Sequence, residues 1–364
     1  MTSAHRELHG FGPPAETLIS TACPYAGCVD IAILAHEAWF TSNRPPYDWT
    51  FAVALPSVAL VVVAVAIAVA WRFVAHRSPS PELGLLRPLG RFAPWVPRLL
   101  AIHAGVSLLA QAARGTFLAP SLDLPSDPLG ATIRIVEGVL GVWLVSGFRV
   151  RGAALLVAVA GPLGMFAYGV VPILERLDLL GIAVFLVLQP PGADRWGATS
   201  ADRAVVERSV FALRALVGGS LVVLAFTEKL ARPELAAAFL DRYPAFNVLD
   251  TLGIPVAEPT FVRVAGAIEL LFGLLIISGA FPQLVTILAG IPFNATLFFL
   301  GTDELIGHLP IYGAMLALLV YGSNVELADV VDRFPRFIGF APRNVGHTRG
   351  RPERRPVAAE GSIR

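Results

Sequence analysis

Two glutamates occupy the same position in a repeated pattern, E-x-x-x-G-x-x-x-x-S-G, and each lies in a stretch apolar enough to cross a lipid bilayer. Glu137 begins the first copy, and Glu269 begins the second copy 132 residues further along the chain. A carboxylate at membrane depth is costly, so its presence there indicates a function. The repeat predicts that one membrane module was duplicated, with one intramembrane acid in each copy.

Further polar residues are expected to converge with Glu269 in the outer half of one helix bundle. They are Glu228, Lys229, Arg263, Asn294, Thr296 and His308. Together they offer a proton acceptor, hydrogen-bond donors and a compensating cation beside apolar walls. We predict that Glu269 acts as acid and base and that His308 acts as a hydrogen-bond donor or proton relay. The alternative interpretation is that these charges only neutralise one another and fix the helix register.

The first module contains a corresponding set of polar residues, namely Gln111, Arg134, Glu137, Arg176 and Asp178. Arg134 and Glu137 are three residues apart on one predicted helix, so they are expected to pair directly. Glu269 has its nearest cation in its own span, Arg263, six residues away on another face. The difference favours Glu269 for chemistry and Glu137 for structure.

Metal and thiol chemistry is only weakly indicated. Cys23 and Cys28 lie in a tail predicted to be outside the cell, where a disulfide is permitted, and inert thiols or a thiol relay are the alternatives. His36 and Glu37 could complete a metal site with them, but this is a sparse ligand set, and we predict no metal. His103 lacks a second histidine at haem spacing and is interpreted as a satisfied core residue.

The composition predicts an integral membrane protein. Hydrophobic residues make up 55% of the 364 residues, charged residues only 15%, and the mean hydropathy is +0.67, whereas soluble domains have about 25% charged residues. A helical span needs roughly 20 apolar residues. We therefore expect an all-α bundle of about nine spans, near residues 51–74, 93–113, 131–147, 151–171, 177–190, 207–228, 259–279, 283–301 and 308–322.

The predicted spans divide the chain into six parts. These are an external tail with a short surface helix (1–50), an extra transmembrane helix (51–74), a cytoplasmic linker (75–92), a four-helix module (93–190), a second four-helix module (207–322) and a partly disordered cytoplasmic tail (323–364). The two modules also match at Arg98 and Arg214, which begin apolar runs, and at Gly181 and Gly313. An even number of spans makes the repeats parallel in the membrane.

The arginines predict the orientation. Most of them fall in loops on one side of a nine-span topology, so the positive-inside rule places the N-terminus outside and the C-terminus in the cytoplasm. Lys229 is the single lysine among 28 basic residues, which is typical of a high-GC bacterial genome. We therefore expect a multi-pass protein of the bacterial cytoplasmic (inner) membrane, in contact with the lipid bilayer.

The second module resembles the DoxX/DoxD family of four-helix membrane proteins. The resemblance rests on Arg214 near the start of its first span, on the Glu228-Lys229 pair near the end of that span, and on Glu269-x-x-x-Gly273 with the Ser-Gly that follows. It is strongest over 207–322, because the first module lacks the Glu-Lys pair. Members of the family include the membrane subunit of a thiosulfate:quinone oxidoreductase and proteins that assemble with thiol-handling or redox enzymes.

The resemblance implies an oxidoreductase subunit of a respiratory chain that works with a quinone and a partner enzyme. Quinone head groups need donors to two carbonyl oxygens and a titratable group, which is the role predicted for Glu269, His308 and the residues around them. The chain has no cofactor-binding motif of its own and no basic, aromatic-interleaved patch for nucleic acid. A non-catalytic anchor or scaffold for a partner complex is the main alternative, and a small-solute transporter is a further one.

Overall fold

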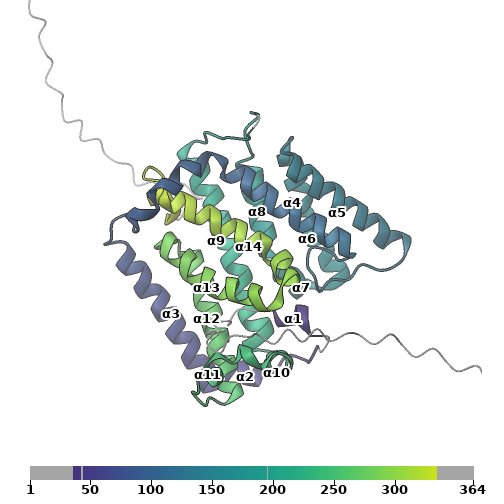
Figure 1. The fold of residues 1–364 in the computed structure, drawn as a ribbon, viewed down its shortest axis with the longest axis vertical. Coiled ribbons are helices and arrows are strands. Elements are labelled where there is room, and N and C mark those ends of the chain that lie inside the picture. The colour runs from purple at the N-terminus through teal and green to yellow at the C-terminus, as the bar shows by residue number, and fades with distance from the viewer. Residues whose placement is uncertain (1–35, 42–43, 195, 334–364) are drawn as a thin grey trace, which may run out of the picture.

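The computed structural model describes residues 36–41, 44–194 and 196–333, most of which are helical (Figure 1). The β contact recorded for these residues is an isolated bridge between Thr116 and Asp123. Within these residues, seven helical segments are long and apolar enough to cross a membrane. They are α3 (Leu55–Ala75), η1 (Gly84–Trp95) continued by α4 (Val96–Arg114), α5 (Pro128–Ser146), α6 (Val150–Tyr168), α9 (Arg203–Leu224) continued by η2 (Ala225–Leu230), α12 (Glu258–Ser278) and α14 (Thr302–Ser323). The prediction of an all-α membrane bundle is confirmed.

Two of the nine predicted spans are not among these seven. One is α8 (Leu177–Leu188), which follows the short helix α7 (Val170–Leu174). At 1.5 Å per residue, its 12 residues reach about 18 Å, short of a hydrocarbon core about 30 Å thick. The other is α13 (Pro282–Leu300), which has 19 residues and lies where a span was expected. The number nine therefore stays a prediction.

Short helices collect at the two ends of the bundle. α2 (Trp49–Val53), α10 (Pro233–Arg242) and α11 (Val248–Thr251) gather at the lower end in Figure 1, with α1 (Glu37–Phe40) above them, and this end is here called the α1 end. η1 and α15 (Ala328–Val331) mark the opposite, α15 end, where Arg72 of α3 donates to the carbonyl of Asp332 at 2.9 Å. Residues 84–92 of the predicted linker lie in η1. The prediction that the α15 end faces the cytoplasm is not tested.

The backbone follows the offset of the sequence repeat. Helices α6 and α13 begin and end 132 residues apart. Gly147 and Gly279, which end α5 and α12, have φ of 78° and 67°, and Gly169 and Gly301, which follow α6 and α13, have φ of 87° and 71°. These left-handed conformations favour glycine. The same breaks therefore recur in both halves of the described chain.

The Ser-Gly of the repeated pattern is a helix C-terminal cap. The Ser278 hydroxyl donates to the carbonyl of Leu275 at 2.7 Å and accepts from the N–H of Ala280 at 3.1 Å. Ser146 makes the equivalent pair of bonds at 2.7 and 3.2 Å. Arg214 also donates to a carbonyl at the end of α12, at 3.0 Å. Because capping accounts for the Ser-Gly, the glutamate is the residue of the pattern left for chemistry.

The central glycine of each copy permits a close helix crossing. A Cβ on Gly141 would lie 2.8 Å from the carbonyl oxygen of Gly105 in α4, and a Cβ on Gly273 would lie 2.8 Å from that of Gly218 in α9. Small residues let membrane helices approach in this way. The pattern therefore accompanies the same close packing twice, of α5 on α4 and of α12 on α9.

Gly218→Ala is expected to lower the free energy of unfolding by about 1–3 kcal/mol, because overpacking forces a backbone shift. The added Cβ would lie 2.5 Å from the carbonyl oxygen of Gly273. The neighbouring Gly219→Ala is the matched control, since its Cβ would come no closer than 3.6 Å to Leu177. SDS-induced unfolding in detergent micelles measures both variants. Equal stability of the two proteins would contradict the proposed close crossing.

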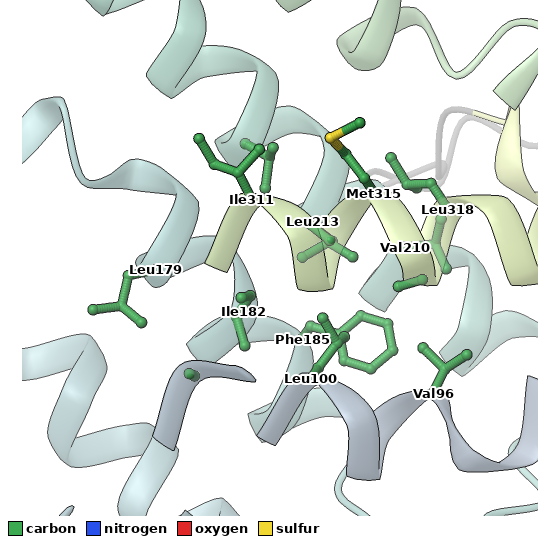
Figure 2. Close-up of a cluster of buried hydrophobic side chains, with 14 of the residues drawn as sticks. Val96, Leu100, Leu179, Ile182, Phe185, Val210, Leu213, Ile311, Met315 and Leu318 are labelled. Carbon is green, nitrogen blue, oxygen red and sulfur yellow. The ribbon is translucent and has the colours of Figure 1, made fainter. Parts of the chain in front are cut away.

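The two halves of the chain share one apolar core (Figure 2). The ten side chains labelled in Figure 2 come from α4, α8, α9 and α14: Val96, Leu100, Leu179, Ile182, Phe185, Val210, Leu213, Ile311, Met315 and Leu318. The last helix of each half packs on the first helix of the other, α14 on α4 and α8 on α9. At the α15 end, Gln189 donates to the hydroxyl of Tyr321, 132 residues away, at 3.0 Å. This interface fixes the positions of the polar groups between the halves.

Candidate functional site

A buried ionic network surrounds Lys229. Its ammonium group lies 3.0 Å from a carboxylate oxygen of Glu269 on α12 and 2.9 Å from one of Glu37 on α1. The adjacent Glu228 accepts hydrogen bonds from the backbone N–H groups of Glu37, at 3.0 Å, and of Ala38, at 3.4 Å. All four ionisable side chains are buried. Three segments far apart in the sequence therefore build one site.

Two successive charged residues of the chain, Glu228 and Lys229, are both buried. In a regular α-helix, neighbouring side chains point about 100° apart. Glu228 and Lys229 are nevertheless only 1% and 2% exposed. They lie in η2, a π-helical turn that ends α9. Such turns are frequent at functional sites.

A second polar group lies beside the first, where α14 meets the start of α8. His308 and Glu304 of α14 are 3.2 Å apart between Nδ1 and a carboxylate oxygen. Arg176 lies 3.4 Å from Asp178 and donates to the carbonyl of Gly307 at 3.3 and 3.4 Å. The first half of the chain thus contributes an acid and a cation to a site in the second half.

Aromatic rings join these two groups. His36 stacks on Trp39 with ring centroids 3.9 Å apart, and its centroid lies 4.7 Å from that of His308. His36 Nδ1 is also 3.8 Å from a carboxylate oxygen of Glu228. Phe293 of α13 packs edge-on against His308 at 4.9 Å. We call the whole assembly the central cluster, comprising His36, Glu37, Trp39, Arg176, Asp178, Glu228, Lys229, Glu269, Glu304 and His308.

The central cluster contains more acids than fixed cations. Within the described residues, the ion pairs of its five carboxyl groups, Glu37, Asp178, Glu228, Glu269 and Glu304, involve two fixed cations, Lys229 and Arg176, besides the titratable His36 and His308. Burying unpaired charge is prohibitive, so this surplus is balanced by bound protons. Glu37 precedes the first span, and burial raises the pKa of its carboxyl group well above the usual 4.5, although Lys229 opposes the shift. The arrangement is therefore suited to holding and exchanging protons.

One buried polar atom of the cluster is available for a further hydrogen bond. Within the described residues, Nε2 of His308 has no hydrogen-bond partner, whereas its Nδ1 lies 3.2 Å from a carboxylate oxygen of Glu304. Buried groups of this kind are usually satisfied by protein or by ordered water. This nitrogen is thus well placed to meet a polar molecule or a water chain.

The predicted site residues separate into two sets. Glu228, Lys229, Glu269 and His308 come together in the central cluster, and Thr296 is buried one turn from Phe293, to whose carbonyl its hydroxyl donates at 2.9 Å. Two of the predicted quinone ligands lie elsewhere. Arg263 donates to the hydroxyl of Ser57 at 3.1 Å and lies over the ring of Phe51, and Asn294 is exposed and donates to its own helix.

The predicted pairing of Arg134 with Glu137 is wrong. Arg134 donates to the carbonyls of Ala112 and Ala113 at 2.5 and 2.6 Å, so it caps the end of α4. Glu137 instead accepts from the backbone N–H of Leu118 at 3.0 Å. Carbonyls at a helix C-terminus lack partners within the helix, so the guanidinium of Arg134 binds these carbonyls and not the carboxylate of Glu137.

The rest of the first-module set is also divided. Gln111 accepts from the hydroxyl of Thr116 at 2.6 Å, inside the first half. Asp178 and Arg176 belong to the central cluster. Among the described residues, no cation lies within ion-pair distance of Glu137. The two glutamates of the repeated pattern therefore have different surroundings.

The part played by the segment before the first span was not predicted from the sequence. That segment was expected to form a surface helix, but His36 and Glu37 are each 4% exposed and belong to the central cluster. The signal available was the adjacent histidine and glutamate in an otherwise apolar stretch. Cys23 and Cys28 lie outside the described residues, and within those residues no group of ligands suited to a metal ion is found. The disulfide stays a prediction.

Comparison with known proteins adds no relative. No protein-family model, no curated protein and no solved structure matches the chain. The geometry of the central cluster is therefore the basis for a functional proposal.

Proposed function

We propose that this membrane protein exchanges protons at the central cluster and that it is the membrane subunit of a quinone-linked redox system. The observation that carries the proposal is the surplus of five buried carboxyl groups over two fixed cations. Intramembrane acids of this kind mark proton relays. The quinone and the partner enzyme in this proposal rest on the resemblance to the DoxX/DoxD family.

The proposed chemistry divides between the chain and its partner. Reduction of a quinone to a quinol takes two electrons and two protons. The electrons come from a partner enzyme, and the protons come from the central cluster. Glu269 gives up a proton while Lys229, 3.0 Å away, stabilises the carboxylate that remains. His308 donates to a carbonyl oxygen of the head group through a ring nitrogen that has no hydrogen-bond partner among the described residues.

The decisive experiment is purification in mild detergent followed by organic extraction and chromatography of bound quinone. We expect stoichiometric quinone in the natural protein and its loss in the Glu269→Gln, His308→Ala double variant. Arg263→Gln is the matched control, because Arg263 lies outside the cluster. A stoichiometric protein partner without quinone would instead identify a scaffold and overturn the redox proposal.

A proton-coupled transporter is the second candidate, and one observation favours it. The cluster lies between the two halves of the chain, with Arg176 and Asp178 from one and His308 and Glu304 from the other. Substrate sites of transporters built from repeats commonly lie at the repeat interface. Proton flux into proteoliposomes driven by a solute gradient, with no quinone or reductant present, would select this candidate.

A further inference from the structure

We propose that His36 and Glu37, which precede the first transmembrane helix, are working members of the central cluster, and that His36 carries protons between the two halves of this cluster. This inference rests on the proposed proton exchange and adds the residues that connect the site. One half is the network of Glu37, Glu228, Lys229 and Glu269. The other half is the group of Arg176, Asp178, Glu304 and His308.

His36 contacts residues in both halves of the central cluster. Its Nδ1 is 3.8 Å from Glu228, and its ring centroid is 4.7 Å from that of His308, which is in turn 3.2 Å from Glu304. The charged and titratable groups that face the ring come from every element packed on it. They are Glu37 on its own segment, Glu228 and Lys229 on η2, Arg176 before α8, and Glu304 and His308 on α14.

The segment that carries His36 is docked by many contacts. Arg242 of α10 donates to the carbonyl of Phe40 at 3.0 Å, and the N–H of Asp48 donates to the carbonyl of Ala231 at 2.8 Å. The ring of Trp39 lies against Gly307, where an added Cβ would be 2.0 Å from the indole. A segment held in this way is a fixed part of the site.

An imidazole in this position passes a proton without keeping it. Burial lowers the pKa of His36 well below 6.5, with help from His308. A neutral ring takes a proton from the acid form of Glu228 on one nitrogen and releases one towards His308 from the other. The ring then returns to the neutral state in its other tautomer, so each transfer conserves protons and charge.

Hydrogen–deuterium exchange of the buried carboxyl groups tests the inference directly. The carbonyl stretch of protonated carboxyl groups is followed by infrared spectroscopy after transfer of the detergent-solubilised protein into D2O, and Glu269→Gln identifies the band. We expect His36→Phe, which keeps an aromatic ring for the stack, to slow exchange about 100-fold. The matched control is His76→Phe, because His76 is exposed at the α15 end.

Two further variants keep the inference falsifiable should His36→Phe fold poorly. His36→Ala is expected to exchange slowly and to recover when free imidazole is added. Gly307→Ala is expected to displace Trp39 and slow exchange without removing an ionisable group, whereas Gly290→Ala, whose Cβ would lie 3.6 Å from Met315, is not. The dependence of the exchange rate on pH should change in the His36 variants and stay unchanged in the Gly290 control.

The outcomes separate the two proposals. If the natural protein has no exchanging carboxyl band, the proposed proton function fails. If it exchanges, but His36→Phe and His36→Ala exchange at the natural rate without imidazole, only the role of His36 is overturned.

Discussion

Replacing Lys229 with methionine is expected to lower the free energy of unfolding by about 3–5 kcal/mol, the usual cost of removing one partner from a buried ion pair. Lys229 pairs with Glu37 and Glu269 at 2.9 and 3.0 Å, and its side chain is buried. Methionine fills a similar volume but leaves those carboxyl groups without their cation. SDS-induced unfolding in detergent micelles, followed by tryptophan fluorescence, measures the loss.

A compensating variant separates lost charge from lost packing. Lys229→Met combined with Glu37→Gln and Glu269→Gln removes the cation together with the two acids that it pairs. Replacing a whole buried ionic group by neutral residues is often close to neutral for stability. We therefore expect the triple variant to recover most of the lost stability. A triple variant as unstable as Lys229→Met would mean that packing, and not charge balance, explains the role of Lys229.

Local signals in the sequence predicted most of what is local in the structure. Apolar stretches gave the helices, and the repeated Ser-Gly lies where α5 and α12 end, because a serine followed by a left-handed glycine caps a helix wherever it occurs. The convergence of Glu228, Lys229 and Glu269 was also expected. Each of these features depends on residues within one span or on neighbouring spans of one module.

Contacts between distant segments could not be predicted in the same way. Glu37 and Lys229 are 192 residues apart, and nothing in the apolar stretch around Glu37 distinguishes docking into a bundle from lying on a membrane. Arg176 and Asp178 were assigned to the first module because of their position in the sequence. Only the packing of α8 and α14 around the shared core places them beside His308.

The two glutamates of the repeated pattern should differ in function by a large factor. Glu269→Gln is expected to reduce quinone reduction, measured in membranes that contain the partner and normalised to the amount of this chain, by about 10²–10⁴-fold, the usual contribution of a general acid or base. Glutamine keeps the size of the side chain, and Lys229 keeps its pairing with Glu37 at 2.9 Å. The loss should therefore occur without a comparable loss of stability.

Glu137→Gln is the control that the repeat itself provides. Glu137 lies in the same position of the pattern, but it contacts the backbone N–H of Leu118 at 3.0 Å, a bond that the carbonyl oxygen of glutamine can also accept. It also lies outside the central cluster, so its substitution should leave quinone reduction close to the natural rate. Equal loss in both variants would contradict a single proton-exchanging site and would instead assign one to each module. The opposite result, loss in Glu137→Gln alone, would move the site into the first half of the chain, where no cation stands beside the acid among the described residues.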